Sequence, residues 1–338
     1  MKAWRTTAVA LVLVLVVAVV AAGVAVAWWL QRPLPMATES VELSIELGTP
    51  PRDIAQAWVR AGVQVPPLWL YQWFRWSGQA RKIRAGSYEI ERGTTPLLLL
   101  EKMVRGDETQ AVVRLIDGWT FRQFRAELAR SDALKPTTAS LSDEQLMATL
   151  GAPGIAPEGR FFPDTYAFSK GSADLTVLRR AYRAMQRRLD AAWQERAADT
   201  PLRSADDALV LASIVEKETG APADRGKVAA VFVNRLRIGM PLQTDPTVIY
   251  GLGSAFDGNL RKRDLLTDTQ FNTYTRGGLP PTPIAMPGKA ALLAAVRPDA
   301  SRALYFVARG NGSSEFSETL AEHNRAVNLY QRGGQRAR

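Results

Sequence analysis

Residues 205–220 read Ala-Asp-Asp-Ala-Leu-Val-Leu-Ala-Ser-Ile-Val-Glu-Lys-Glu-Thr-Gly, and this stretch decides how the rest of the chain is interpreted. Its apolar centre predicts a buried helix over residues 205–219. On a helical wheel of about 100° per residue, Leu211, Val215 and Glu218 share one quadrant. The apolar face of this helix therefore carries a carboxyl group at its last turn.

The two glutamates of this helix are expected to have different environments. Glu216 lies roughly 200° from Glu218 on the wheel, which predicts a position toward solvent. Gly220 is expected to take the left-handed conformation that ends many helices. The negative end of the helix dipole and partial burial then both raise the pKa of Glu218. A carboxylic acid that stays protonated near neutral pH suits general acid catalysis, whereas a helix-end acid paired with an arginine is the structural alternative.

The composition restricts the available chemistry. The chain of 338 residues has no cysteine and one histidine, His323. These counts exclude disulfides and thiol nucleophiles, and they argue against a Ser-His-Asp hydrolase or a multi-histidine metal site. We therefore expect no metal and no cofactor, with the chemistry resting on carboxylates, hydroxyls, amides and lysines.

An uncharged run rich in Ala, Val and Leu occupies residues 8–30. Its length suits the ~20 residues that cross the hydrocarbon core of a membrane. Lys2 and Arg5 precede it, which predicts a cytoplasmic N-terminus over residues 1–7 and an exported body. A cleaved signal peptide is the alternative, but the run is longer than the usual h-region of about 7–15 residues, which favours a retained anchor.

The formal net charge is +10. On an exported body, this excess of positive charge indicates an anionic polymer or anionic lipid headgroups, and we expect no nucleic acid partner. Part of the excess comes from an arginine-rich stretch at residues 331–338, interpreted as a basic tail.

The remaining pattern predicts an α+β protein with two globular parts joined to the anchor by a linker at residues 31–40. A small α/β unit over residues 41–107 alternates short strands with helices, and its many aromatic side chains are expected to form its core. A larger mixed α/β domain over residues 108–330 contains three long helices, expected at residues 174–197, 205–219 and 224–238. Residues 239–305 are expected to be irregular, and such a region in a compact domain is usually functional.

Three segments combine amides or hydroxyls with aromatic rings, at residues 158–166, 243–251 and 271–281. Aromatic rings and directional hydrogen bonds together suit a sugar-binding cleft, whereas turn formation is the alternative role of these residue types. The candidate substrate-binding residues are Phe162, Gln243, Thr244, Asp245, Tyr250, Asn272 and Tyr274.

Taken together, several motifs resemble one family, the MltG/YceG-like endolytic murein transglycosylases. The core motif is Leu211-Ala212-Ser213-Ile214-Val215-Glu216-Lys217-Glu218-Thr219. The other motifs, in matching order, are Phe161-Phe162-Pro163-Asp164-Thr165-Tyr166, Asn234-Arg235-Leu236, Leu242-Gln243-Thr244-Asp245-Pro246-Thr247-Val248-Ile249-Tyr250, Asn272-Thr273-Tyr274, Gly278-Leu279-Pro280-Pro281, Tyr305-Phe306-Val307 and Glu322-His323-Asn324. One departure is Ser314, which stands where the family usually has a histidine.

The resemblance implies that the small unit is a LysM-like module and that Glu218 is the catalytic residue. It also implies cleavage of the bond between N-acetylmuramic acid and N-acetylglucosamine, leaving 1,6-anhydro ends on nascent glycan strands. The implied location is the inner membrane, as a single-pass protein with a periplasmic body. The implied partners are peptidoglycan glycan strands, the membrane and a peptidoglycan synthase.

Two other functions fit the residues. A membrane-anchored scaffold would bind glycan without cleaving it and would bind equally well after Glu218→Gln. A muramidase would use Glu218 with a second carboxylate, Asp245 or Glu158, and would leave reducing ends. A folate-pathway lyase is a further reading, but the predicted export argues against it.

Overall fold

The computed structural model describes residues 2–332, so most of the expected basic tail, residues 333–338, lies outside the described residues. The chain forms two compact units. The first contains Met1–Ala111 and Ala167–Ser172, and the second contains Val112–Tyr166 and Ala173–Arg338. The fold is mixed α/β, as the sequence predicts, and its strands pair two by two: β1 (Ser40–Ile45) with β2 (Gly86–Glu91), β3 (Gln110–Arg114) with β5 (Thr165–Ser169), β4 (Leu134–Lys135) with β6 (Ser172–Ala173) and β7 (Tyr305–Ala308) with β8 (Ser314–Ser317).

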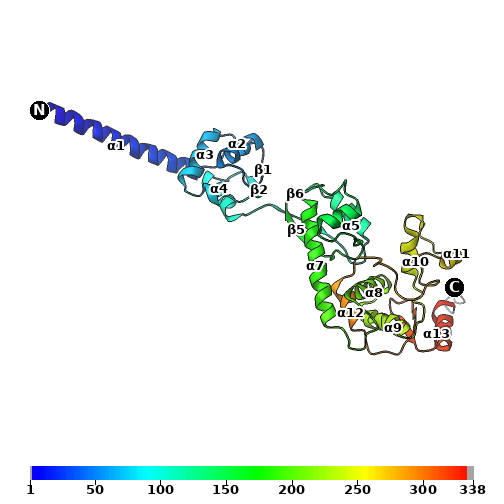
Figure 1. The fold of residues 1–338 in the computed structure, drawn as a ribbon. Coiled ribbons are helices and arrows are strands. Elements are labelled where there is room, and N and C mark those ends of the chain that lie inside the picture. Colours follow the sequence, from blue (N-terminus) through cyan, green and yellow to red (C-terminus); the bar gives the residue numbers. More distant parts are fainter. Residues whose placement is uncertain (1, 333–338) are drawn as a thin grey trace. The chain divides into compact units, whose positions relative to one another are not determined.

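The first unit begins with a long helix followed by a small α/β body (Figure 1). Its elements are α1 (Lys2–Gln31), β1 (Ser40–Ile45), α2 (Pro51–Ala61), α3 (Pro67–Trp76), the 3-10 helix η1 (Ala80–Lys82), β2 (Gly86–Glu91) and α4 (Pro96–Arg105). The strands β3 (Gln110–Arg114) and β5 (Thr165–Ser169) each contribute residues to both units, and the two-residue strand β6 is likewise divided between Ser172 and Ala173.

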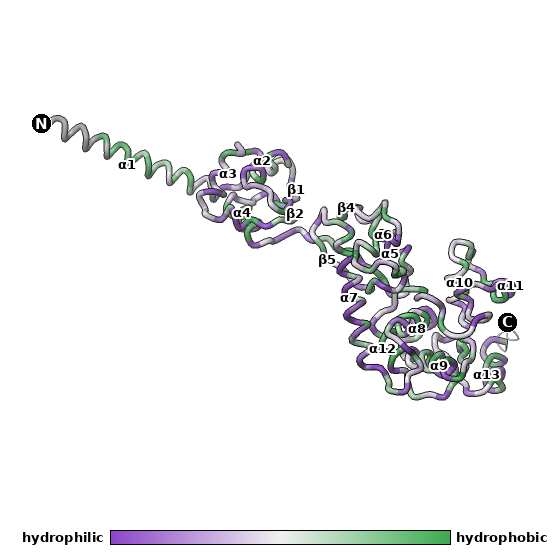
Figure 2. Tube along the Cα trace, viewed as in Figure 1, coloured by the Kyte–Doolittle hydropathy of each residue, from purple (hydrophilic) through white to green (hydrophobic). Residues whose placement is uncertain are grey.

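Helix α1 is apolar along most of its length (Figure 2). Within the described part of the chain, Leu13–Gln31 is the one helical segment long and apolar enough to cross a membrane. This finding agrees with the membrane span expected near the N-terminus.

The stretch expected to be a linker is packed against the small body. Leu34 is buried, and its backbone N–H donates to the carbonyl oxygen of Thr94 at 2.8 Å. Met36 forms an isolated antiparallel bridge with Val63. The chain that follows α1 is therefore part of the body's packing within the first unit.

Local sequence signals explain the small body well. Thr95 caps α4 by accepting a hydrogen bond from the backbone N–H of Leu98, and Pro96 follows at the first helical position, where proline is favoured. The strands β1 and β2 pair antiparallel, with Val41 opposite Ile90. Not all of the aromatic residues join the core, because Trp69 and Trp76 are exposed.

The second unit is mostly helical. Its elements are α5 (Phe121–Arg130), β4 (Leu134–Lys135), α6 (Asp143–Thr149), β6 (Ser172–Ala173), α7 (Asp174–Gln194), α8 (Ala205–Glu218), η2 (Pro222–Asp224), α9 (Arg225–Arg237), α10 (Asp245–Leu252), η3 (Gly253–Ala255), α11 (Lys262–Leu266), α12 (Lys289–Val296), β7 (Tyr305–Ala308), β8 (Ser314–Ser317), α13 (Leu320–Val327) and η4 (Asn328–Arg332).

Helix α8 lies at the centre of the second unit, and it contacts α7, α9, α10 and α12. Every residue from Ala208 to Val215 is buried, so the helix is covered on all sides and not on one face alone. The expectation that residues 239–305 are irregular is wrong for α10, α11 and α12. Helix α12 is the main omission, because it packs directly against α8 and supplies part of the core.

Candidate active site

The end of α8 positions the carboxyl group of Glu218. Ser204 caps the start of the helix by accepting from the backbone N–H of Asp207 at 3.1 Å. At the other end, Thr219 leaves the helix with an extended backbone (φ −86°, ψ 105°) and donates its hydroxyl to the carbonyl oxygen of Val215. Gly220 does not have a positive φ, so the expected left-handed glycine cap is wrong. Threonine ends this helix through its own backbone turn and hydroxyl.

Glu218 lines an open cavity of about 580 Å³ in the second unit. Three of the candidate substrate-binding residues, Gln243, Asp245 and Tyr274, line the same cavity. The remaining walls come from α9, β7 and α13, and they include Phe232, Arg235, Tyr305, Phe306, Leu320 and His323. The structure therefore gathers a partly buried carboxyl group with amide, phenol and carboxylate groups around one space.

The surroundings of Glu218 raise the pKa of its carboxyl group above the ordinary value. Burial is the largest cause, and the nearby negative charge of Asp245 acts in the same direction. The Thr244 hydroxyl opposes both by donating a hydrogen bond to Oε1 of Glu218. The direction agrees with the sequence-based expectation, and the dominant cause is the expected burial.

Residues 243–245 connect these groups to one another. Gln243 is the one non-glycine residue with a positive φ (50°) among the described residues, and its backbone N–H donates to the carbonyl oxygen of Thr273 at 3.1 Å. The backbone N–H of the buried Thr244 donates to the hydroxyl of Thr273, also at 3.1 Å. A strained backbone of this kind persists where its surroundings fix it. Thr273 thus fixes the position of the hydroxyl that contacts Glu218.

Asp245 is the first residue of α10, not the loop residue that the sequence suggested. It accepts a hydrogen bond from the phenol of Tyr274 at 2.6 Å. The pKa of that phenol is raised, mainly by burial and then by Asp245, so Tyr274 stays a hydrogen-bond donor at neutral pH.

Arg235 is a cavity residue that the sequence analysis did not select. It is buried, and its guanidinium donates to the carbonyl oxygens of Leu304 at 2.7 Å and of Leu242 at 2.8 Å. It also lies 5.3 Å from the ring of Tyr305, which stacks on His323 with ring centroids 5.2 Å apart. The sequence signal was available, because Arg235, Tyr305 and His323 each lie in one of the quoted motifs.

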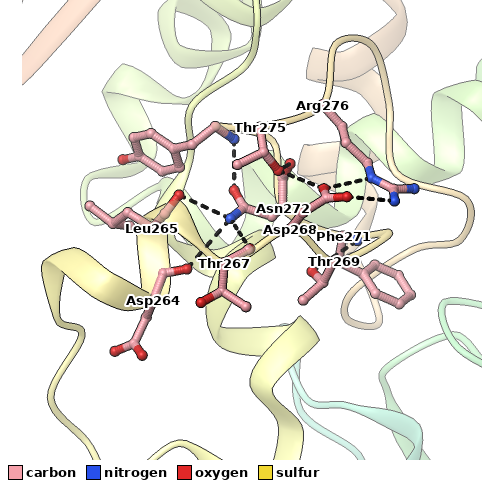
Figure 3. Close-up of polar contacts among 10 residues, drawn as sticks. Asp264, Leu265, Thr267, Asp268, Thr269, Phe271, Asn272, Thr275 and Arg276 are labelled. Atoms are coloured by element: carbon pink, nitrogen blue, oxygen red, sulfur yellow. Dashed lines mark hydrogen bonds and ion pairs between the residues drawn. The ribbon is translucent and has the colours of Figure 1, made fainter.

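Asn272 is fully buried and holds a loop in place (Figure 3). Its amide nitrogen donates to the carbonyl oxygens of Thr267 at 2.7 Å and Leu265 at 3.0 Å. Its amide oxygen accepts from the backbone N–H of Tyr274 at 2.9 Å. Asn272 therefore differs from the expectation of a sugar-facing amide, because its polar atoms are used to shape the loop that carries Tyr274.

Phe162 and Tyr250 do not line the cavity of Glu218. Phe162 is buried in the core, with the Arg188 guanidinium 4.0 Å from its ring centroid. Tyr250 lines a second cavity of about 1220 Å³ that is also bounded by Glu158 and Lys217. Phe162, Tyr250 and Asn272 are thus three candidate substrate-binding residues that do not line the Glu218 cavity.

Glu158 is a buried acid in that second cavity. It accepts hydrogen bonds from the backbone N–H of Phe121 at 3.0 Å and from the phenol of Tyr250 at 3.1 Å. Burial outweighs these bonds and raises the pKa of Glu158 to about 7.

The expectation that Glu216 faces solvent is wrong. Its side chain is only 11 % exposed, and it accepts a hydrogen bond from the backbone N–H of Gly288 at 3.0 Å. Burial raises its pKa, and Asp117 adds to the effect. Gly288 and Arg225 lie against the Glu216 side chain, on the side of α8 that the wheel assigned to solvent.

Comparison with known proteins identifies the family of this chain. Residues 43–329 match the family model described as the YceG-like family. The chain belongs to the YceG-like family. The resemblance inferred from the sequence motifs is therefore confirmed.

The chain is similar to two proteins named endolytic murein transglycosylase. The relative from Bacillus subtilis (strain 168) is 33 % identical over 268 residues, which cover 74 % of each chain. The relative from Streptococcus pneumoniae serotype 2 (strain D39 / NCTC 7466) is 25 % identical over 278 residues, covering 72 % of this chain and 50 % of that protein. A crystal structure of a YceG-like protein from Listeria monocytogenes has a TM-score of 0.52 and 27 % identity, and the match covers 85 % of this chain and 98 % of that one.

Ser314 occupies the position where the family resemblance leads one to expect a histidine. It begins β8, and its backbone N–H donates to the carboxylate of Asp224 at 2.7 Å. This hydrogen bond uses the backbone and does not depend on the side chain at the position.

Proposed function

We propose that this chain is an endolytic lytic transglycosylase that cleaves the bond between N-acetylmuramic acid and N-acetylglucosamine in peptidoglycan. The observation that carries the proposal is the carboxyl group of Glu218, partly buried with a raised pKa and lining an open cavity. The activity named for the relatives from Bacillus subtilis and Streptococcus pneumoniae supports the same reaction class.

In the proposed reaction, Glu218 serves first as an acid and then as a base. Its proton goes to the glycosidic oxygen as the bond from C1 of N-acetylmuramic acid to that oxygen breaks. The resulting carboxylate then takes the proton of the C6 hydroxyl of the same sugar while O6 bonds to C1. The products are a 1,6-anhydro end and a free sugar hydroxyl, Glu218 is protonated again, and no water is consumed.

The neighbours of Glu218 suit both steps. The negative charge of Asp245 and burial favour the protonated acid of the first step. The Thr244 hydroxyl favours the carboxylate that acts in the second step. We propose that Gln243 and Tyr274 orient the sugars at the cavity wall.

A two-carboxylate muramidase is the second candidate. The observation that favours it is the position of Asp245, which lines the same cavity as Glu218. In that reaction water attacks C1 or resolves a glycosyl-enzyme intermediate, and the product has a reducing end. Product chemistry therefore separates the two reactions.

We further propose how the chain is organised for this task. Helix α1 anchors the protein in the inner membrane with its N-terminus in the cytoplasm, and the body acts in the periplasm. Residues 41–107 act as a LysM-like module that holds glycan, and residues 108–330 carry the catalytic site. The anchor keeps the enzyme beside nascent strands, where a peptidoglycan synthase is the expected partner.

The decisive experiment compares Glu218→Gln with Glu216→Gln in the full chain. Glutamine keeps the size of each side chain but removes the transferable proton. We expect Glu218→Gln to lower the release of anhydro-muropeptides from glycan strands by at least the ~10²–10⁴-fold typical of general acid–base catalysis. Glu216→Gln keeps an acceptor for the N–H of Gly288, so its loss should be far smaller.

Mass spectrometry of the products and thermal melting of each variant complete the test. Reducing ends from the wild-type chain would establish the muramidase instead. Glycan binding without any cleavage would establish the scaffold. If Glu218→Gln is active and Glu216→Gln is inactive, the proposal has assigned the catalytic acid to the wrong glutamate.

A further inference from the structure

The outer face of α3 is apolar, although it is not covered by the rest of the first unit. Leu70 and Phe74 point into the core and are fully buried. On the opposite side of the helix, Leu68, Trp69 and Trp76 are 60 %, 53 % and 68 % exposed. A helix on the surface of a soluble domain normally presents polar residues on that side. This exposed apolar face is therefore expected to bind another surface.

The start of α4 extends the same kind of surface. Leu97 and Leu98 are exposed, whereas Leu99 and Leu100 are buried. The indole N–H of Trp73 on α3 donates to the carbonyl oxygen of Pro96 at 3.1 Å, which holds the start of α4 beside α3. We call the exposed side chains of Leu68, Trp69, Trp76, Leu97 and Leu98 the α3–α4 patch.

The α3–α4 patch adjoins the end of α1. The ring of Trp29, near the last turn of α1, meets the ring of Trp69 edge-on with centroids 5.7 Å apart. Helix α1 also contacts α4, and Figure 1 shows α3 and α4 next to the end of α1. Helix α1 ends at Gln31, and Leu34 is already buried in the core of the small body, so no free linker separates α1 from the body.

We propose that the α3–α4 patch lies in the headgroup interface of the membrane that α1 spans, so that the first unit rests on the bilayer surface. This inference depends on the proposed anchoring by α1. Tryptophan is favoured at the membrane interface, where its ring is partly apolar and its N–H can reach water. Apolar side chains on a surface helix enter the boundary between headgroups and acyl chains.

Nearby charges suit the same occupant. Arg32 follows α1 and stacks its guanidinium 3.7 Å from the ring centroid of Trp28, and Arg75 is exposed on α3 beside Trp76. Cationic side chains at the membrane surface are attracted to lipid phosphates. A glycan strand or a second copy of the chain could also cover aromatic side chains, and the experiment separates those occupants.

The absence of cysteine allows clean single-site labelling of the full chain. We would reconstitute Trp76→Cys, Val20→Cys and Leu47→Cys separately in lipid nanodiscs that contain phosphatidylethanolamine and phosphatidylglycerol. Each variant would carry an environment-sensitive fluorophore. Val20 lies in α1 and reports on the anchor. Leu47 is apolar and 94 % exposed, so its exposure matches that of the patch residues. It follows the C-terminal end of β1, whereas α1 leads into the N-terminal end of that strand, and it therefore serves as the control.

We expect the label at position 76 to emit at shorter wavelength and to be quenched by lipids that carry nitroxide near the headgroup, whereas the label at position 47 should behave as in water. The label at position 20 should be quenched by nitroxide deep in the acyl chains. A label at position 20 that behaves as in water would overturn the anchoring itself. With position 20 in lipid, a label at position 76 that remains in water overturns the docking alone.

Two further results would also overturn the docking. The label at position 76 could change only when glycan strands are added, or only at several copies per nanodisc. The first result would assign the patch to glycan, and the second to a second copy of the chain. Leu68→Cys, labelled in the same way, provides an independent position in case labelling at position 76 disturbs folding.

Discussion

Replacing Thr244 with valine removes the one hydroxyl that donates to the carboxylate of Glu218 among the described residues, while the volume of the side chain hardly changes. The hydroxyl stabilises the ionised form, so it lowers the pKa of Glu218 against the effects of burial and of Asp245. Its removal must therefore raise that pKa further. The sign is fixed by the donor role of the hydroxyl, because a donor stabilises a carboxylate more than a carboxylic acid.

The size of the shift follows from the strength of the bond. A hydrogen bond to a charged group contributes about 1.5–3 kcal/mol, and one pKa unit corresponds to about 1.4 kcal/mol. We therefore expect the pKa of Glu218 to rise by roughly one to two units in Thr244→Val. The first step needs protonated Glu218, so activity falls as pH rises through this pKa. The alkaline limb of the pH profile should move to higher pH by the same amount.

The assay is the pH dependence of kcat/KM for cleavage of a defined glycan strand, with folding of each variant checked by thermal melting. Thr244→Ser is the matched control, because it keeps the hydroxyl and should leave the limb where it lies in the wild-type chain. A folded Thr244→Val protein with an unmoved limb would refute the argument that Thr244 tunes Glu218. An equal shift in both variants would show that packing, and not the hydroxyl, sets the pKa.

Three further predictions follow from buried side chains. Below pH about 4.5 Glu158 is protonated in both the folded and the unfolded chain. Between pH 4.5 and 7 it ionises only in the unfolded chain, so the free energy of unfolding falls as the pH rises toward 7. The rise of this pKa from 4.5 to about 7 corresponds to about 3 kcal/mol, and urea unfolding of Glu158→Gln should lose that much pH dependence between pH 4 and 8. Asn272→Ala removes the bonds to the carbonyls of Leu265 and Thr267, so the loop should become sensitive to proteolysis and the chain should lose about 1–3 kcal/mol per unsatisfied buried group. Leu34→Ala should cost about 2–5 kcal/mol in denaturant unfolding of the full chain, whereas a residue in a free linker would change stability by less than about 0.5 kcal/mol.

The sequence predicts the elements whose signals are local. The spacing of apolar residues predicts the three long helices at residues 174–197, 205–219 and 224–238, and all three are confirmed as α7, α8 and α9. The raised pKa of Glu218 was predicted for the same reason, because an apolar helix that ends in an acid must bury part of that acid.

The features that were missed depend on residues distant in sequence. Helix α12 consists almost entirely of Ala, Leu and Val, so it has no polar face and no helical periodicity to detect. The helical wheel gives the side of α8 on which Glu216 lies. It does not show that Gly288, distant in the sequence, packs against that side and donates a hydrogen bond to Glu216. Asn272 carries the same polar groups whether it faces a sugar or a loop, and only the positions of Leu265 and Thr267 decide between the two.

The arrangement around Glu218 has a further consequence for a reaction that uses one carboxyl group twice. An acid with a very high pKa transfers its proton poorly, and one with a low pKa is a weak base in the second step. The two neighbours that act in opposite directions, Asp245 and Thr244, are consecutive in the chain. Thr273 holds the backbone of Thr244 in place, and Tyr274 holds the carboxylate of Asp245. A displacement of this one segment, which begins at the positive-φ residue Gln243, therefore changes both influences together.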